Sequence, residues 1–184
     1  MKHWYVGAAL LALATGVGIL LCRKRTAEEP PIDGGIRHQV DTGAPKVIRA
    51  TEITEFSCEF STTDRCLEDT PIAGGIFTLF ADKVKGQLQI RGRSEIAGEY
   101  AFCPEERFFR QLQELVSRYD LAQYNGQFYT VSGLPPDLGM KLRICYVSGE
   151  AIHASNNQST FLPLEAMEEL IALFQTEINK SGGI

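Results

Sequence analysis

Apolar and polar residues alternate with a period of two in the first folded part of the chain. In residues 52–60, EITEFSCEF, the alternation puts Phe56, Cys58 and Phe60 on one face and polar residues on the other. This pattern predicts a strand with one solvated face. Residues 76–93, IFTLFADKVKGQLQIRGR, predict two further strands joined in a hairpin around Lys85-Gly86.

A second group of strands is expected in the C-terminal half. Residues 140–147, MKLRICYV, and 150–155, EAIHAS, flank Ser148-Gly149 and predict another hairpin. A short strand is expected over residues 128–131, inside a stretch that is otherwise rich in turn-forming residues.

Two segments follow the period of a helix instead, and each begins at a proline, Pro104 and Pro163. Their apolar residues recur on one face, which predicts amphipathic helices that pack on a sheet. We therefore expect an α+β fold, in which an N-terminal transmembrane helix precedes an antiparallel sheet of about five or six strands with the two helices on one face. The helical stripes are Phe108, Phe109, Leu112, Leu115, Val116 and Tyr119, then Leu164, Met167, Leu170, Ile171, Phe174 and Ile178.

The expected transmembrane helix is an uncharged run of 19 residues, 4–22. At about 1.5 Å per residue, a helix of this length crosses the hydrocarbon of a bilayer. We expect an uncleaved single-pass anchor with the lipid bilayer as its partner. The side chains expected at its two ends are Trp4 and Tyr5, with which the run begins, and Arg23, Lys24 and Arg25, which follow it.

Two alternatives to this anchor stay open, a removed signal peptide and a lipidated Cys22. Cleavage after Ala27 would place the large cation Arg25 where signal peptidase needs a small residue. Lipidation would require a small residue before the cysteine, where Leu21 stands. The cations after the run favour a cytoplasmic domain, with an extracytoplasmic domain as the alternative.

Composition divides the chain into three parts. Residues 1–25 are the anchor with its basic flank, residues 26–47 are a flexible linker rich in proline and glycine, and residues 48–180 form a single domain of ordinary size. All 23 acidic residues follow residue 25, together with only 14 of the 18 basic residues. Nucleic acid is therefore not expected as a partner.

The sequence offers one candidate pair for thiol catalysis, Cys145 and His153 on the arms of the second hairpin. A two-residue turn would place Cys145 opposite Ile152, so that the thiol and the imidazole point to opposite faces, whereas a three-residue turn would place the two side chains opposite each other. The cysteines of the expected domain are either free thiols in a reducing compartment or paired in an oxidising one. They are Cys58, Cys66, Cys103 and Cys145.

No motif of the sequence specifies a catalytic, cofactor-binding or metal-binding residue. The chain lacks a C-x-x-C pair and a phosphate-binding glycine loop, and it has only three histidines. Polar loops are the remaining candidates for function, because amides recognise peptide backbone or sugars as well as forming turns. The possible partner surface consists of Tyr124, Asn125, Pro135, Asn156, Asn157 and Gln158.

The segments YDLAQYNG, VSGLPPDLGMKL and SGEAIHASNNQSTFLPLEAMEELIALF resemble those of an uncharacterised bacterial family of small α+β domains that are often membrane-anchored or exported. The resemblance covers roughly residues 48–178 and implies one domain at a bacterial membrane, without an activity. We therefore expect a membrane-tethered, non-catalytic domain that binds a protein or cell-envelope partner. The alternatives are a thiol-dependent or hydrolytic enzyme that uses Cys145 or Cys66, and an exported domain stabilised by disulfides.

Overall fold

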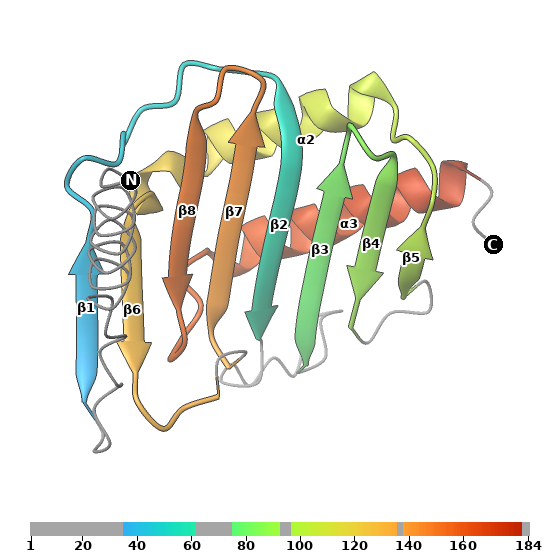
Figure 1. Ribbon diagram of the computed structural model, residues 1–184. Helices are drawn as coiled ribbons and strands as arrows, with labels where there is room; N and C mark the ends of the chain where they lie inside the picture. The colour runs from blue at the N-terminus through green and yellow to red at the C-terminus, as the bar shows by residue number, and fades with distance from the viewer. Residues whose placement is uncertain (1–34, 62–74, 93–96, 136–137, 182–184) are drawn as a thin grey trace, which may run out of the picture. The chain divides into compact units, whose positions relative to one another are not determined.

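Eight strands form one mixed sheet in the computed structural model, which describes residues 35–61, 75–92, 97–135 and 138–181. The order across the sheet is β1-β6-β8-β7-β2-β3-β4-β5 (Figure 1). The strands are β1 (Ile36–Val40), β2 (Ile53–Ser61), β3 (Ile76–Asp82), β4 (Gln87–Arg91), β5 (Gly98–Tyr100), β6 (Gln127–Val131), β7 (Met140–Tyr146) and β8 (Ala151–Asn156). The helices are α2 (Glu106–Arg118), the short 3-10 helix η1 (Leu121–Tyr124) and α3 (Leu164–Lys180).

The predicted antiparallel sheet of five or six strands is wrong in both number and direction. Strand β1 lies in the segment predicted as a linker and pairs antiparallel with β6, and the three-residue β5 adds a further edge strand beside β4. Strand β6 pairs parallel with β8, which makes the sheet mixed. Because β7 is already flanked by β2 and β8, β6 extends the sheet at the free edge of β8 instead of forming a hairpin with β7.

The transmembrane part of the predicted fold class also requires correction. Among the described residues, no helix is both long enough and apolar enough to cross a membrane. The predicted anchor, residues 4–22, lies outside the described residues, together with Trp4, Tyr5, Arg23, Lys24 and Arg25. The fold that the structure supports is a mixed sheet with two helices on one face.

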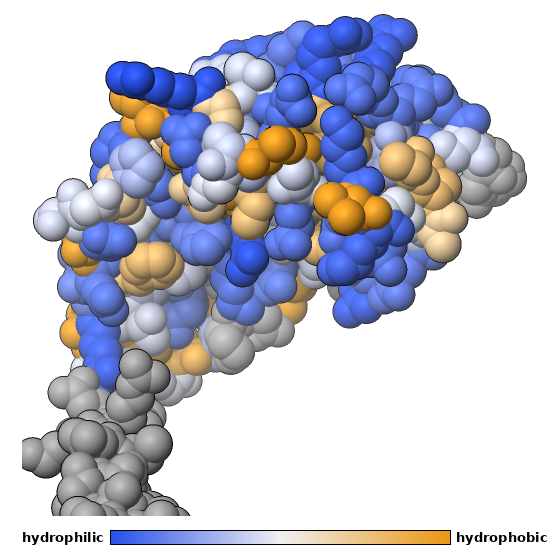
Figure 2. Space-filling model, turned by 45° about the horizontal axis from the view of Figure 1, so that its top comes forward, coloured by the Kyte–Doolittle hydropathy of each residue, from blue (hydrophilic) through white to orange (hydrophobic). Residues whose placement is uncertain are grey.

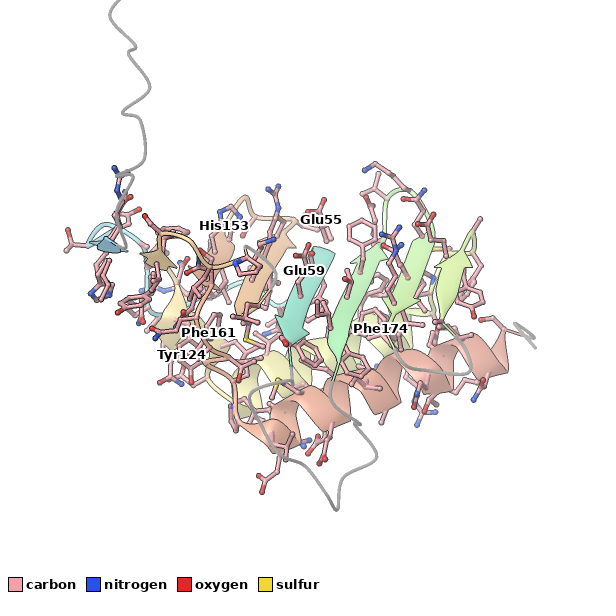
Figure 3. The ribbon with its side chains drawn as sticks, turned by 90° about the horizontal axis from the view of Figure 1, so that it is seen from below. Glu55, Glu59, Tyr124, His153, Phe161 and Phe174 are labelled. Carbon is pink, nitrogen blue, oxygen red and sulfur yellow. The ribbon has the colours of Figure 1, made fainter. Side chains whose placement is uncertain are left out.

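Helices α2 and α3 cover one face of the sheet, and the core lies between these layers (Figure 1). The ring of Phe174 lies 5.1 Å from Phe108 and 5.9 Å from Phe56, so α3, α2 and β2 meet at one aromatic cluster. Figure 3 shows Phe174 between α3 and the sheet, whereas Glu55, Glu59 and His153 project from the opposite face. Burial of each large core side chain contributes about 1.5–3 kcal/mol.

A buried carboxylate joins the two helices. Glu177 of α3 is 2% exposed, and its Oε1 accepts a hydrogen bond of 2.7 Å from the backbone N–H of Glu105, which precedes α2. The N-terminus of a helix carries unpaired N–H groups and partial positive charge, so a carboxylate stabilises it. This contact fixes the start of α2 against α3.

Candidate functional site

A groove with a volume of about 820 Å³ runs along α2, and we call it the α2 groove. Its second wall comes from the start of β2 and from the turn between β3 and β4. The residues that line it are Thr51, Glu52, Ile53 and Lys83, then Glu106, Phe109, Arg110, Gln113, Glu114, Ser117 and Arg118 of α2. The volume falls within the range of about 300–1,000 Å³ that is typical of ligand sites.

The floor of the α2 groove is apolar and its rim is charged. Phe109 and Ile53 form part of the floor, and the ammonium of Lys83 lies 5.7 Å from the centre of the Phe109 ring. Along α2 the groove-lining residues Glu106, Arg110, Glu114 and Arg118 are spaced by four, so they share one side of the helix and alternate in charge.

Only part of this charged rim is already paired. Lys83 Nζ lies 3.3 Å from Glu106, and Arg118 Nη1 lies 2.6 Å from Glu169 of α3. Within the described residues, Arg110 and Glu114 have no ion-pair partner, so both charges are available to a ligand.

Two buried polar atoms near the groove, Gln113 Oε1 and the Tyr146 hydroxyl, make no hydrogen bond of normal length and angle among the described residues. Tyr146 pairs with the groove residue Ile53 across β2 and β7 and is 4% exposed. Burial and the Glu150 carboxylate raise the pKa of Tyr146 to about 12, although the neighbouring Gln113 amide opposes this rise. An unpaired buried polar group costs about 1–3 kcal/mol.

Removal of the Tyr146 hydroxyl is therefore expected to stabilise the fold. Tyr146→Phe keeps the ring and deletes the unpaired group, so the free energy of unfolding should rise by about 1 kcal/mol in urea denaturation. Tyr129→Phe removes a hydroxyl from a half-buried side chain and should change stability by less than about 0.5 kcal/mol. Destabilisation by Tyr146→Phe would instead reveal a hydrogen bond to this hydroxyl.

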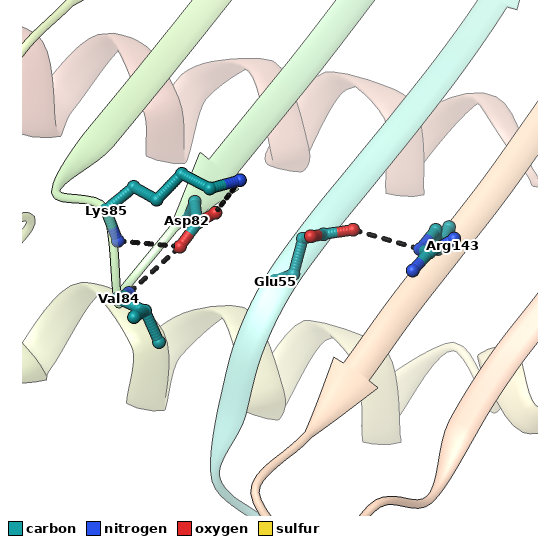
Figure 4. A network of polar contacts seen from close by, with 5 residues as sticks. All are labelled: Glu55, Asp82, Val84, Lys85 and Arg143. Carbon is teal, nitrogen blue, oxygen red and sulfur yellow. Dashed lines mark hydrogen bonds and ion pairs between the residues drawn. The ribbon is translucent and has the colours of Figure 1, made fainter.

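The turn that carries Lys83 is held by Asp82, as Figure 4 shows. Asp82 Oδ1 accepts hydrogen bonds of 2.9 Å from the Val84 N–H and 2.8 Å from the Lys85 N–H, and Oδ2 lies 3.1 Å from Lys85 Nζ. Burial acts to raise the pKa of Asp82, but these hydrogen bonds and the Lys85 charge outweigh it and lower the pKa below its usual value. The ionised carboxylate thus fixes one wall of the groove.

This lowered pKa predicts a loss of stability in acid. Since the pKa of Asp82 is lower in the folded chain than its ordinary value of 3.8, its contribution to stability is complete above pH 3.8 and disappears as the pH falls through the folded-state pKa. Asp82→Asn should be less stable than wild type by about 1 kcal/mol near pH 7, and the difference should shrink near pH 3. Denaturation curves at the two pH values would contradict this if the difference stayed constant.

The face of the sheet opposite the helices carries ion pairs between side chains of the neighbouring strands β2 and β7. Arg143 Nε lies 2.9 Å from Glu55, and Lys141 Nζ lies 2.9 Å from Glu59 (Figure 4 shows the first pair). Partial burial and then the Arg143 guanidinium lower the pKa of the nearby His153. The charges of β2 and β7 on this face are thus largely satisfied by each other.

The register of the second hairpin differs from both registers considered from the sequence. Cys145 pairs with Ala151 and Arg143 pairs with His153, so the thiol and the imidazole lie on the same face as diagonal neighbours. The expectation that they point to opposite faces is therefore wrong. No hydrogen bond joins them in the described structure, and the Cys145 sulfur instead raises the pKa of Arg143, followed by the charge of Glu55.

The described cysteines form no disulfide with one another. Cys58, Cys103 and Cys145 are free thiols, and Cys66 lies outside the described residues. Burial, followed by the charge of Glu59, strongly raises the pKa of the Cys58 thiol. In the described ranges no cluster of three or more His, Cys, Asp or Glu residues is arranged to hold a metal ion.

Three amides of the predicted partner surface are used within the fold. Asn125 is 4% exposed and makes three hydrogen bonds, while both amide atoms of Asn157 bond the backbone of Val131, at 2.7 and 2.9 Å. Asn156 Oδ1 accepts a bond of 2.8 Å from the Gln158 N–H in a turn. These amides therefore hold loops in place.

The other predicted surface residues lie in different surroundings. Pro135 is exposed in the loop after β6. Tyr124 lies with Asn156 in a small cavity lined by aromatic rings, apart from the residues of the α2 groove. The structure thus brings together only two of the predicted residues at one cavity.

Sequence reasoning missed the α2 groove. The alternating charges at positions 106, 110, 114 and 118 were visible as a pattern, but such a pattern is also typical of a solvated helix face. Only the fold shows that β2 and Lys83 form an opposite wall. Comparison of the chain with protein-family models, curated proteins and solved structures gives no match.

Proposed function

We propose that this domain is a non-catalytic binding module whose α2 groove holds a segment of a protein partner. The observation that carries the proposal is the combination of an apolar floor with two charged groups, Arg110 and Glu114, that have no ion-pair partner in the described part of the chain. Apolar contact over Phe109 would supply affinity, and hydrogen bonds to these groups would fix the orientation of the segment.

The charge of the rim favours a peptide over a strongly charged ligand. Three cations and three carboxylates line the α2 groove, so a ligand of one sign gains no net attraction from it. A peptide segment offers N–H donors, carbonyl acceptors and side chains of both charges, which match an alternating rim. Nucleic acid is further disfavoured because the chain from residue 26 onward is strongly acidic.

Exposed apolar side chains beside the α2 groove support a docking role. Val84 is 83% exposed next to the groove residue Lys83, and Val147 is 63% exposed and donates its N–H to the Glu52 carbonyl at 3.0 Å. Figure 2 brings forward the end of the sheet that carries the turns after β3 and β7, and it shows separate hydrophobic patches among hydrophilic side chains. Such patches contribute contact area around a central groove.

A peptide selection tests this proposal directly. Peptides enriched from a random display library against the purified domain should bind wild type and lose about tenfold or more in affinity with Arg110→Glu, because the charge reversal leaves an unmatched rim. Arg107→Glu is the matched control, since Arg107 lies on the same helix but lines a different depression beside α3. Equal loss in both variants, or no enrichment at all, would overturn the proposal.

The cellular location stays a prediction from the sequence. The membrane tether and the cytoplasmic orientation both depend on residues 4–25, which lie outside the described residues.

A further inference from the structure

A second cavity lies at the edge of the sheet formed by β1, β6 and β8, next to η1 and the segment that precedes α3. Four aromatic side chains line it, and we call it the aromatic pocket. They are His38 of β1, Tyr124 of η1, Tyr129 of β6 and Phe161, which precedes α3. Figure 3 shows Tyr124 and Phe161 beside each other on the helix side of the sheet.

The rings form two pairs. The centres of His38 and Tyr129 are 5.5 Å apart, and those of Tyr124 and Phe161 are 4.9 Å apart, both with tilted planes. These side chains come from segments far apart in the sequence, so the fold itself assembles them. The remaining lining residues are uncharged: Gln127, Ala154, Ser155 and Asn156.

The size of the aromatic pocket limits what it can hold. Its volume is about 120 Å³, which is below the range of about 300–1,000 Å³ for sites that enclose a whole ligand. At about 30 Å³ per water molecule, the space corresponds to a compact group of about four or five heavy atoms. A single functional group fits, with the rest of the ligand outside.

The chemistry of the walls selects a cation. Aromatic faces carry negative electrostatic potential and attract ammonium groups, most strongly where water is excluded. A quaternary ammonium group also has apolar methyl groups, which match an uncharged wall better than a hydrated Lys or metal ion would. The acidic surface of the domain adds long-range attraction for any cation.

A sugar is a poorer match, because the amides beside the rings are already engaged. Asn156 Oδ1 accepts bonds from the Gln158 and Ser159 N–H groups, and its Nδ2 donates to Ser159 Oγ at 3.3 Å. Gln127 Nε2 donates to the Gln123 carbonyl at 3.0 Å. Few amide groups therefore remain to recognise several hydroxyls.

We propose that the aromatic pocket binds a quaternary ammonium group of the choline class, with Tyr124, Tyr129 and Phe161 as the main ring contacts. This site is separate from the α2 groove and goes beyond the binding function proposed for that groove. The ammonium group comes either from a free solute or from a lipid headgroup.

The decisive experiment compares two ligands of equal shape. Calorimetric titration with choline chloride at pH 8, with sodium chloride as blank, should show saturable binding. The neutral isostere 3,3-dimethyl-1-butanol should bind about tenfold more weakly, because it lacks the charge that the rings attract. Equal binding of both compounds would reveal only an apolar crevice and would overturn the proposal, as would preferential binding of glucose.

Variants locate the binding at the rings. Phe161→Leu and Tyr124→Leu should each weaken choline binding about tenfold. Arg110→Glu in the α2 groove should leave choline binding unchanged, so failure of one site is distinguishable from failure of the other. Thermal unfolding identifies a variant that fails to fold, and choline binding unaffected by both leucine variants would reject this site.

Phosphatidylcholine vesicles separate the two sources of the ligand. Cosedimentation that choline inhibits would assign the aromatic pocket to a lipid headgroup. Binding of choline without cosedimentation would assign it to a free solute. Absence of binding to both probes would overturn the proposal.

Discussion

Asn125→Ala is expected to lower the free energy of unfolding by about 3 kcal/mol. Asn125 Nδ2 donates to the carbonyls of Pro45 and Ala151, at 2.9 and 3.0 Å, and Oδ1 accepts from the His153 N–H at 2.8 Å. One buried side chain thus joins the segment before β2 to strand β8. Alanine would leave three backbone groups without this partner and would remove a side chain that is itself buried.

The measurement is urea denaturation of the wild type and the variant under identical conditions. Gln158→Ala is the matched control from the same predicted surface, because Gln158 is exposed, and its effect should stay within about 0.5 kcal/mol. If Asn125→Ala kept full stability and lost only partner binding, Asn125 would be a contact residue, as the sequence first indicated.

The helices and the central hairpins were predictable because their burial patterns are local. The apolar stripe of the first predicted helix is buried in α2 at Phe108, Phe109, Leu112, Leu115 and Val116. The alternation of Phe56, Cys58 and Phe60 is likewise buried in β2. A face that is buried along its whole length leaves a periodic signal in the sequence.

The edge strands were not predictable for the opposite reason. All five residues of β1, IRHQV, are exposed, so no buried face imposes alternation on them. Their strand conformation depends on pairing with β6, where Gln39 meets Phe128, a residue far along the chain. Pairing between distant segments leaves no local pattern.

The predicted register of the β7–β8 hairpin was wrong because the connection between the two strands is longer than the sequence prediction assumed. Strands β7 and β8 are joined by residues 147–150, with Gly149 at a φ of 86°. The resulting pairs, such as Ile144 with Ile152, bring Cys145 and His153 to one face. Turn geometry fixes which side chains share a face, and a shift of one residue reverses it.

The candidate sites were hidden because each is assembled from separate segments. Tyr124 and Asn156 were singled out from the sequence and do line the aromatic pocket, but His38 was placed in a linker and Phe161 had no assigned role. The α2 groove needs β2, Lys83 and α2 together. The sequence shows which residues have suitable side chains, but only the fold shows which of these residues lie next to one another.

Gly139→Ala is expected to destabilise the protein by about 3 kcal/mol. A Cβ atom at this position would lie 1.9 Å from the Asn156 carbonyl oxygen, and 2.8 and 2.9 Å from the carbonyl carbons of Asn156 and Asn157. These are backbone atoms at the end of β8, where Met140 pairs with Asn156. They cannot rotate away as a flexible side chain can.

Relief of this clash would have to separate β7 from β8, because Gly139 is also held on its other side. Its carbonyl accepts a hydrogen bond of 2.9 Å from the Ser61 N–H of β2. Gly149→Ala is the control: its φ of 86° is strained for alanine, but a Cβ there meets nothing within 4 Å, so about 1 kcal/mol should be lost. In thermal and urea unfolding, the Gly139→Ala variant should be clearly less stable than the Gly149→Ala control. Equal stability of the two variants would show that β7 and β8 do not approach so closely at Asn156.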